Sequence, residues 1–91
     1  MRKGNVEALR RRDNRQRALS LEQTKIRVLA VERILNDGRK HTAEEIEKTL
    51  YLRYGIKVGR KTVYHDIYAI DKIMPIEVIM GRGGGFRKMV V

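Results

Sequence analysis

The hydrophobic period of this sequence changes at Pro75, and that change limits the folds open to the chain. Before Pro75 the apolar residues recur at helical spacing, whereas the two runs after it, IEVIM and FRKMVV, have the composition of β-strands. The segment GRGGG between these runs supplies the glycines that a hairpin tip needs. Proline also ends the helix before it, because its ring removes a backbone donor. The sequence therefore predicts an α+β fold in which helices precede a β-hairpin.

Capping residues divide the helical part into three helices. Ser20 and Thr42 each stand three residues before a glutamine or a glutamate, the spacing at which the hydroxyl accepts a first-turn N–H. Gly38 and Gly55 offer helix stops, and Gly59 can serve as an N-cap. The expected helices cover residues 20–36, 42–54 and 60–72, and residues 39–41 offer a short edge strand.

The first of these helices has apolar residues on two sides. One side carries Leu21, Val28, Val31 and Leu35, and the other carries Ile26, Leu29, Ala30 and Ile34. A helix of this kind is expected between two layers. In a chain of 91 residues the second layer is either the N-terminal segment or another copy of the chain. The partly apolar faces of the hairpin offer a second surface for a homodimer.

The chain is strongly basic, with a formal net charge of +10 from 21 Lys and Arg against 11 Asp and Glu. A small domain with this balance attracts polyanions, of which nucleic acid is the first candidate and an anionic membrane surface the second. No apolar run approaches the roughly 18 residues that span a bilayer, and no apolar signal core follows Met1. We therefore expect a cytoplasmic, nucleoid-associated protein with no membrane contact.

Half of the net charge lies in residues 1–19, which hold seven Lys or Arg against two acids. This segment is expected to be a basic N-terminal arm in front of one domain over residues 20–91. Its arginines could track a phosphate backbone or enter a minor groove, and a solubilising tail is the alternative. The candidate contacts in the arm are Arg10, Arg11, Arg12, Arg15 and Arg17.

The helix expected over residues 60–72 separates its apolar and polar residues. Val63, Ile67 and Ile70 fall in one narrow sector, which should face the core. An outward row lies opposite them, and it consists of Lys61, His65, Tyr68 and Lys72, flanked by Arg60, Thr62 and Tyr64. Most charged helix faces are merely solvated, but such faces intersperse glutamates, and the outward row contains no acid. With the free N–H groups of its first turn, this face suits the DNA major groove.

Two segments, TAEEIEKTLYLRYGIKVGRKTVYHDIYAI and GRGGGF, together resemble a known family. The first is similar to the helix-turn-helix of bacterial regulators of the deoxyribose-repressor type, especially the DNA-binding domains of WYL-domain regulators. The second is similar to their wing. The resemblance covers about residues 24–90 and implies a winged helix-turn-helix fold, with helix 60–72 as the recognition helix. It implies base contacts by Lys61, His65 and Tyr68, and backbone contacts by Arg60, Thr62, Tyr64 and Lys72.

The sequence also departs from that family in three ways. Gly59 stands where such regulators often have serine, and the path from Thr42 to the recognition helix is longer than in their compact members. The effector-sensing domain of WYL regulators has no counterpart, so we expect no small-molecule effector.

The expected wing, residues 81–88, is the second place where cations meet glycines. Its candidate contacts are Arg82, Gly83, Gly84, Gly85, Arg87 and Lys88. Arg82 could reach a minor groove or a phosphate where the glycines permit close approach. The alternative is a flexible tip with incidental cations. A nucleotide-binding loop is not expected, because no helix and no Walker lysine follow the glycines.

The sequence gives little support to an enzyme or a metalloprotein. It has no cysteine, and for His41 and His65 we expect no paired acid or histidine at ligand spacing on either helix. Asp66 has no nucleophile or second carboxylate in reach, so it is expected to pair with a nearby arginine. We therefore expect no catalytic residue, no metal and no cofactor.

These features predict sequence-specific binding of double-stranded DNA in transcription regulation, with helix 60–72 in the major groove and the wing on the adjacent backbone or minor groove. Two alternatives stay open. One is a DNA-architectural or recombination accessory factor of a mobile element. The other is a protein-interaction module whose charge is incidental, and DNA affinity that is weak and insensitive to salt would favour it.

Overall fold

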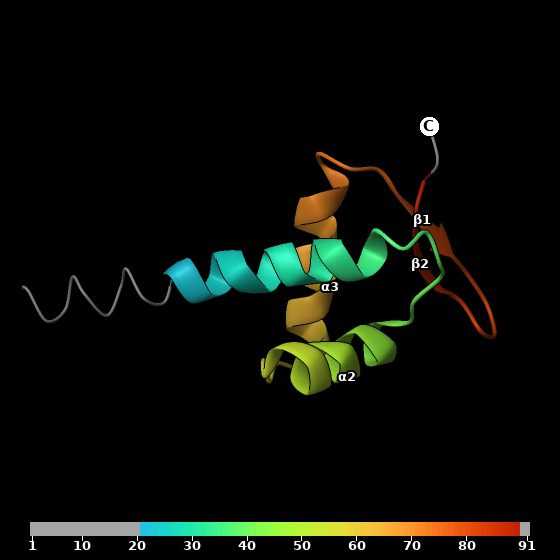
Figure 1. Ribbon diagram of the computed structural model, residues 1–91. Helices are drawn as coiled ribbons and strands as arrows, with labels where there is room; N and C mark the ends of the chain where they lie inside the picture. Colours follow the sequence, from blue (N-terminus) through green and yellow to red (C-terminus); the bar gives the residue numbers. More distant parts are fainter. Residues whose placement is uncertain (1–20, 90–91) are drawn as a thin grey trace, which may run out of the picture.

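The structure is a computed structural model that describes residues 21–89, and these residues form three helices followed by a two-stranded antiparallel hairpin (Figure 1). This order of elements is the one that the sequence predicts. The expected arm, residues 1–19, and the Ser20 cap lie outside the described residues. The elements are helix 21–35, α2 (Ala43–Tyr54), α3 (Arg60–Asp71), β1 (Ile76–Ile79) and β2 (Gly85–Lys88).

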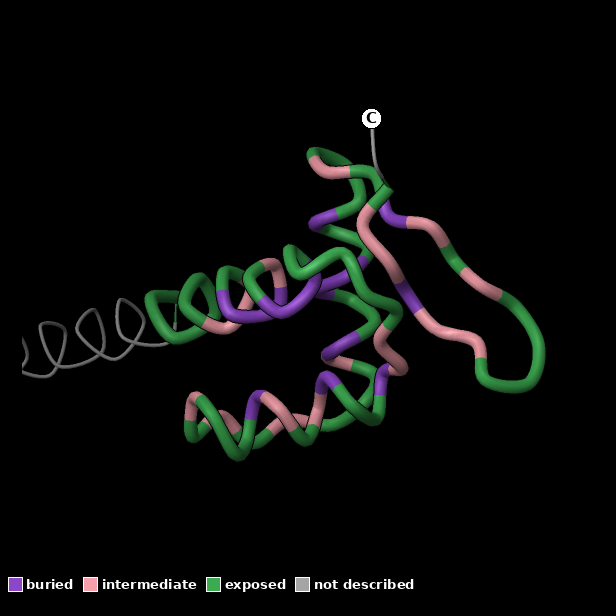
Figure 2. The backbone as a smooth tube through the Cα atoms, turned by 45° about the vertical axis from the view of Figure 1, so that its right-hand side comes forward, coloured by how far each residue is buried: buried purple, intermediate pink, exposed green. Residues whose placement is uncertain are grey.

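The core lies where the three helices approach one another, as the buried positions in Figure 2 show. Each helix contributes the apolar residues of one side, and the hairpin adds one residue from each strand. The prediction that Val63, Ile67 and Ile70 face the core is confirmed, since all three are buried. The buried apolar residues are Ala30, Val31, Ile34, Leu35, Ala43, Ile46, Leu50, Val63, Ile67, Ile70, Ile76 and Phe86.

Local hydrogen bonds set the ends of the helices. The Thr42 hydroxyl accepts the backbone N–H of Glu45 at 3.1 Å, which confirms Thr42 as the N-cap of α2. Gly55 ends α2 in the left-handed conformation, with φ of 68°, which glycine adopts without a steric penalty. After α3, the Asp71 carboxylate accepts the N–H of Ile76 at 2.8 Å, and this bond ties the end of α3 to the start of β1.

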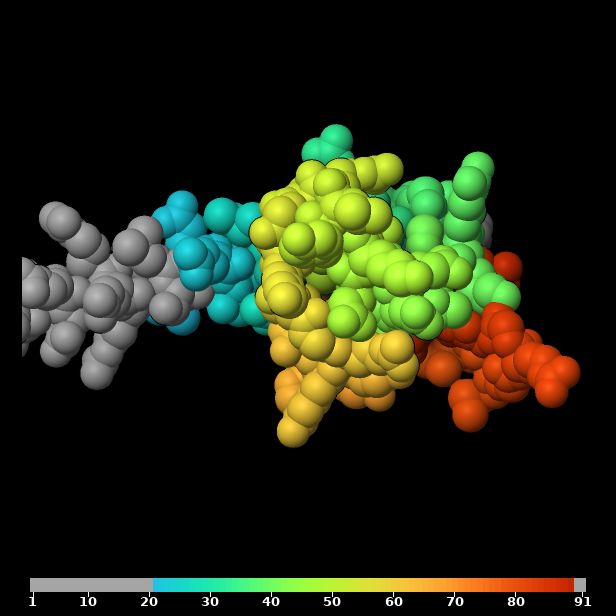
Figure 3. All heavy atoms as spheres, turned by 90° about the horizontal axis from the view of Figure 1, so that it is seen from below, coloured from blue at the N-terminus to red at the C-terminus, as the bar shows by residue number. Residues whose placement is uncertain are grey.

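Only one of the two layers expected around helix 21–35 lies within the described residues, since the arm is outside them and the structure holds a single copy of the chain. Residues 21–89 cover only one of its sides, and both sets of apolar residues contribute to that side, because Ala30 and Val31 are buried together. Leu21, Ile26 and Leu29 remain exposed. The start of this helix extends past α2 and α3, away from the hairpin (Figures 1 and 3). Despite these apolar residues, no helix within the described part of the chain has the length and apolar character needed to cross a membrane.

The hairpin is joined to the segment before α2. Phe86 and His41 exchange two backbone hydrogen bonds of 2.8 Å, so the edge strand expected over residues 39–41 is reduced to one bridge. A Cβ added to Gly85 would lie 2.5 Å from the His41 carbonyl oxygen, so the close approach requires glycine there. The strands are shorter than the apolar runs suggest, because β1 ends at Ile79 and β2 runs only from Gly85 to Lys88.

Candidate functional site

The outward row lies on the exposed side of α3. Lys61, His65, Tyr68 and Lys72 are all exposed, with Lys72 as the C-cap residue. Tyr68 presents 59% of its surface to solvent, which is high for an aromatic residue in a small domain. The structure therefore brings these four residues together on one accessible helix face.

The side chains of the outward row make no contacts that would neutralise them. Across residues 21–89, neither Lys61 nor Lys72 has an ion-pair or hydrogen-bond partner for its ammonium group, and the ring of His65 has none either. Because water alone solvates these groups, an incoming anion or base edge would not have to displace an internal partner. This face can therefore accept an external acceptor at low cost.

Of the two acids on α3, Asp71 accepts the backbone N–H of Ile76 and Asp66 is turned inward. Asp66 is 4% exposed, and its two carboxylate oxygens accept Nε and Nη2 of Arg27 at 2.6 and 2.9 Å. This pair confirms the expectation that Asp66 pairs with an arginine. The hydrogen bond to Asp66 raises the pKa of the Arg27 guanidinium, although burial opposes it. A bidentate pair of this kind fixes α3 against helix 21–35.

The first turn of α3 leaves backbone donors free. Its N-cap, Gly59, has no side chain to accept a hydrogen bond, and the first intrahelical bond runs from the Val63 N–H to the Gly59 carbonyl. The N–H groups of residues 60–62 therefore point out of the helix without an intrahelical acceptor. They add partial positive charge at the end of the outward row.

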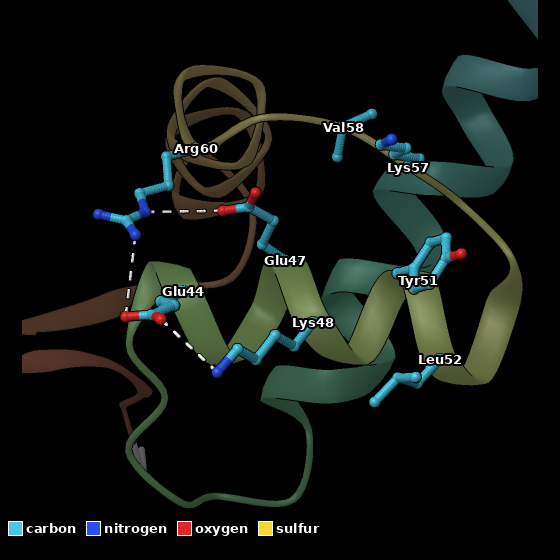
Figure 4. Close-up of a pocket in the computed structure, with 8 residues that line it drawn as sticks. All are labelled: Glu44, Glu47, Lys48, Tyr51, Leu52, Lys57, Val58 and Arg60. Atoms are coloured by element: carbon cyan, nitrogen blue, oxygen red, sulfur yellow. Dashed lines mark ion pairs between the residues drawn. The ribbon is translucent and has the colours of Figure 1, made fainter.

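Arg60, beside those donors, is held by acids on α2. Its Nη2 lies 3.8 Å from Glu44 and its Nε lies 3.6 Å from Glu47, and Glu44 also lies 3.6 Å from Lys48 (Figure 4). These pairs bridge α2 and the start of α3 above a shallow open groove. Arg60 is thus less available to an external anion than the outward row.

The other two residues that flank the outward row, Thr62 and Tyr64, differ in their surroundings. The Tyr64 ring packs edge-on against Phe86 of β2, with the ring centroids 5.9 Å apart and an angle of 64° between the planes. This contact is of the favourable aromatic type and joins α3 to the hairpin. Thr62 is partly buried beside the outward row.

The cations of the hairpin fall into two groups. Arg87 donates to Glu77 across the strand pair at 2.6 Å, and Lys88 donates to Asn36 at 3.2 Å. Arg82, in the hairpin tip of residues 80–84, is exposed and has no side-chain partner among the residues described. Of the three expected cations, Arg82 is therefore the one left for an external partner.

The backbone of the hairpin explains why glycine occupies these positions. A Cβ at Gly84 would collide with the carbonyl oxygen of Ile79, so this position requires glycine as Gly85 does. Gly83 has a φ of 75°, and its carbonyl accepts a hydrogen bond from the Lys40 ammonium group. The tight turn and the contact with Lys40 account for these glycines without any ligand.

His41 has the neighbours that the sequence analysis did not find. Its Nε2 lies 2.9 Å from the Asp37 carboxylate, and its Nδ1 lies 3.7 Å from Glu45. Burial raises the pKa of Asp37, but the hydrogen bonds from His41 and from the Arg39 N–H outweigh it and lower the pKa overall. Both acids stand four residues from His41 along the chain, so the prediction of no acid at ligand spacing was wrong at this histidine. No set of three potential metal ligands occurs within residues 21–89.

Besides the neighbours of His41, three contacts were not foreseen from the sequence. They are the Lys40 contact with the hairpin tip, the Arg60 bridge to α2 and the Tyr64 contact with Phe86. Comparison of the chain with protein-family models, with curated proteins and with solved structures finds no match.

Proposed function

We propose that this chain is a winged helix-turn-helix protein that binds double-stranded DNA in a sequence-specific way, as a transcription regulator. The observation that carries this proposal is the outward row of α3, an exposed face with two unpaired lysines, a histidine and a tyrosine, and no acid. A face of this composition and width matches the major groove, which presents acceptors on base edges between two rows of phosphates.

The arrangement of the helices supports the proposal. α2 and α3 are joined by residues 55–59, and both pack on helix 21–35. In this fold class the second helix of the pair enters the major groove, and the first lies across the backbone. The Arg27–Asp66 pair and the buried Val63 and Ile67 hold α3 in place, so its outward face is presented by a rigid support.

Within the proposal, the residues of α3 fall into those that would contact base edges and those that would contact phosphates. Lys61, His65 and Tyr68 are the base-edge candidates, because they are exposed on the side of the helix opposite the core. Lys72, Thr62 and the free N–H groups of the first turn are the phosphate candidates. A phosphate contact by Arg60 requires it to leave Glu44 and Glu47, and a contact by Tyr64 is limited to the part of the side chain that Phe86 leaves open.

The hairpin has the role of the wing. The unpaired Arg82 in the hairpin tip is its candidate for the minor groove or the adjacent backbone. Arg87 and Lys88 stabilise the strands through Glu77 and Asn36, so we assign them a supporting role.

The test is selection from a pool of random duplexes at about 0.15 M salt, a physiological ionic strength, followed by sequencing of the retained DNA. An enriched motif is expected, and Lys61→Ala should lose about 1–3 kcal/mol on that motif and much less on random DNA. Retention without enrichment would instead support the DNA-architectural alternative. Failure to retain any duplex would leave a protein-interaction module.

A further inference from the structure

A stripe of four residues on helix 21–35 lies on the side turned away from the core. We call it the 22–33 stripe, and it consists of Glu22, Ile26, Leu29 and Arg33. At about 100° per residue these positions fall within a sector of about 60°. Ile26 and Leu29 are 50% and 62% exposed, and Glu22 and Arg33 are exposed as well. Across residues 21–89 neither charged member has an ion-pair partner.

The order of residues in the 22–33 stripe is self-complementary. An acid stands at one end, a base at the other, and two apolar residues lie between them. The pair Glu22 and Arg33 and the pair Ile26 and Leu29 share one midpoint, between residues 27 and 28. When a second copy lies antiparallel about that midpoint, Ile26 faces Leu29 of the other copy and each Glu22 faces an Arg33. A parallel copy would instead place each charged residue beside its own kind, which is repulsive.

The surroundings leave room for such a pairing. The buried side of the helix, with Arg27, Ala30 and Ile34, faces the rest of the domain, so pairing on the stripe leaves the core contacts unchanged. The start of the helix projects past α2 and α3 (Figures 1 and 3). The outward row belongs to α3, so the stripe and the outward row lie on different helices.

We propose that the 22–33 stripe is a self-association surface, through which two copies of the chain form an antiparallel helix pair held by Ile26–Leu29 contacts and two Glu22–Arg33 ion pairs. This inference goes beyond DNA binding and does not depend on it. Four residues from each copy cover less than the roughly 1,200 Å² that marks a stable interface. The association in free solution is therefore weak and depends on concentration.

The test uses the full chain without DNA, in sedimentation equilibrium at about 0.15 M salt and at concentrations up to about 1 mM, where weak complexes form. Glu22→Arg and Arg33→Glu should each raise the dissociation constant roughly tenfold, because two attractive pairs become repulsive. The double variant should return to the wild-type value. An equimolar mixture of the two single variants should associate more strongly than either alone. In a parallel pair like charges would already be opposed in the wild-type chain, so neither single change would weaken association.

Two matched variants separate this surface from general effects of charge and folding. Leu29→Glu should abolish association with an unchanged melting temperature, since this side chain lies outside the core. Ile73→Glu changes a residue that is 91% exposed after α3, and it should leave association unchanged. A wild-type chain that stays monomeric throughout, a double variant that fails to recover, or association that survives Leu29→Glu would each overturn the proposal.

Discussion

α2 and α3 are helices of 12 residues each, and they differ in whether their exposed charged side chains have ion-pair partners within the chain. On α2, Glu44 and Glu47 pair with Lys48 and Arg60, so acids and bases neutralise one another within the chain. On α3 the outward row is left unpaired, and Asp66 is turned into the core. The difference shows that exposed charge alone does not mark a binding face. A face whose charges lack internal partners is the better candidate, because a ligand then replaces only water.

The N-terminal ends of the two helices also differ in whether their first-turn N–H groups have an acceptor within the chain. Thr42 supplies an oxygen to the first turn of α2, whereas Gly59 supplies none to the first turn of α3. The positive end of the α2 dipole is thus satisfied from within, and that of α3 is open to an external anion.

The largest expected effect concerns the pair that turns Asp66 inward. Arg27→Met leaves a buried carboxylate without its partner, so the free energy of unfolding should fall by about 3 kcal/mol, measured by urea denaturation. Arg53→Met on α2 changes an exposed residue and should alter stability by no more than about 0.5 kcal/mol. Similar losses in unfolding free energy in both variants would mean that the Arg27–Asp66 pair contributes no more to stability than an exposed arginine does.

The next effect compares the two helix faces directly. Lys61→Glu with Lys72→Glu should weaken DNA binding about 100-fold at about 0.15 M salt, since two contacts of about 1–3 kcal/mol each are lost. Lys48→Glu with Lys57→Glu changes the net charge equally on the α2 side and should cost only a few-fold. Titrations of both double variants with one labelled duplex give the comparison. Equal losses would reduce the interaction to a response to net charge.

The caps give a smaller effect on stability. Thr42→Ala should cost about 1 kcal/mol, because one first-turn donor of α2 loses its acceptor. Gly59→Ser should add a few tenths of a kcal/mol to α3. The residue fits there, since Gly59 has a φ of −90° and no atom lies within 4 Å of an added Cβ.

Gly59→Asp extends the same comparison to function. It should stabilise α3 about as much as Gly59→Ser but weaken DNA binding, because its carboxylate would lie where a phosphate is proposed to bind. Thermal melts and duplex titrations of the two variants separate the effects. Unchanged binding by the aspartate variant would exclude a phosphate at this helix start.

The smallest effect is the pH dependence that comes from Asp37, before α2. Its pKa lies below the ordinary value of 3.8, so its stabilising contribution is present above that pH and is lost as the pH falls through the lowered value. The side chain is 43% exposed, so the contribution is only a few tenths of a kcal/mol. Asp37→Asn should therefore lose less stability than wild type between about pH 5 and about pH 2, as seen in urea midpoints. An identical loss in both proteins would contradict this role.

Local signals were enough to predict the order of elements and the inner side of α3. The Thr42 hydroxyl, Gly55 and Pro75 act within a few residues of their own positions, and the spacing of Val63, Ile67 and Ile70 follows from helix geometry alone. The outward row follows from the same geometry, because it lies opposite a buried sector.

Contacts between distant segments could not be predicted in this way. The sequence indicates an arginine for Asp66, but Arg27 is chosen by how helix 21–35 packs on α3, 39 residues away. The same holds for Lys40 and Gly83, which are 43 residues apart. His41 differs, because Asp37 and Glu45 are each only four residues away and their spacing is visible in the sequence. The second apolar side of helix 21–35 stays a prediction, because periodicity indicates a preference for burial and does not say which segment or copy provides it.

Within the hairpin, the backbone requires glycine at several positions but leaves the side chain at position 82 free to change. Gly84 and Gly85 leave no space for a methyl group, and Gly81 and Gly83 have positive φ values of 92° and 75°, whereas Arg82 between them has a negative φ and is exposed. Changes of side chain at Arg82 would therefore alter what the tip reaches without disturbing the strands below it. Such a division lets a lineage, or a protein engineer, change binding preference by editing only a few codons while the folding of the domain stays the same.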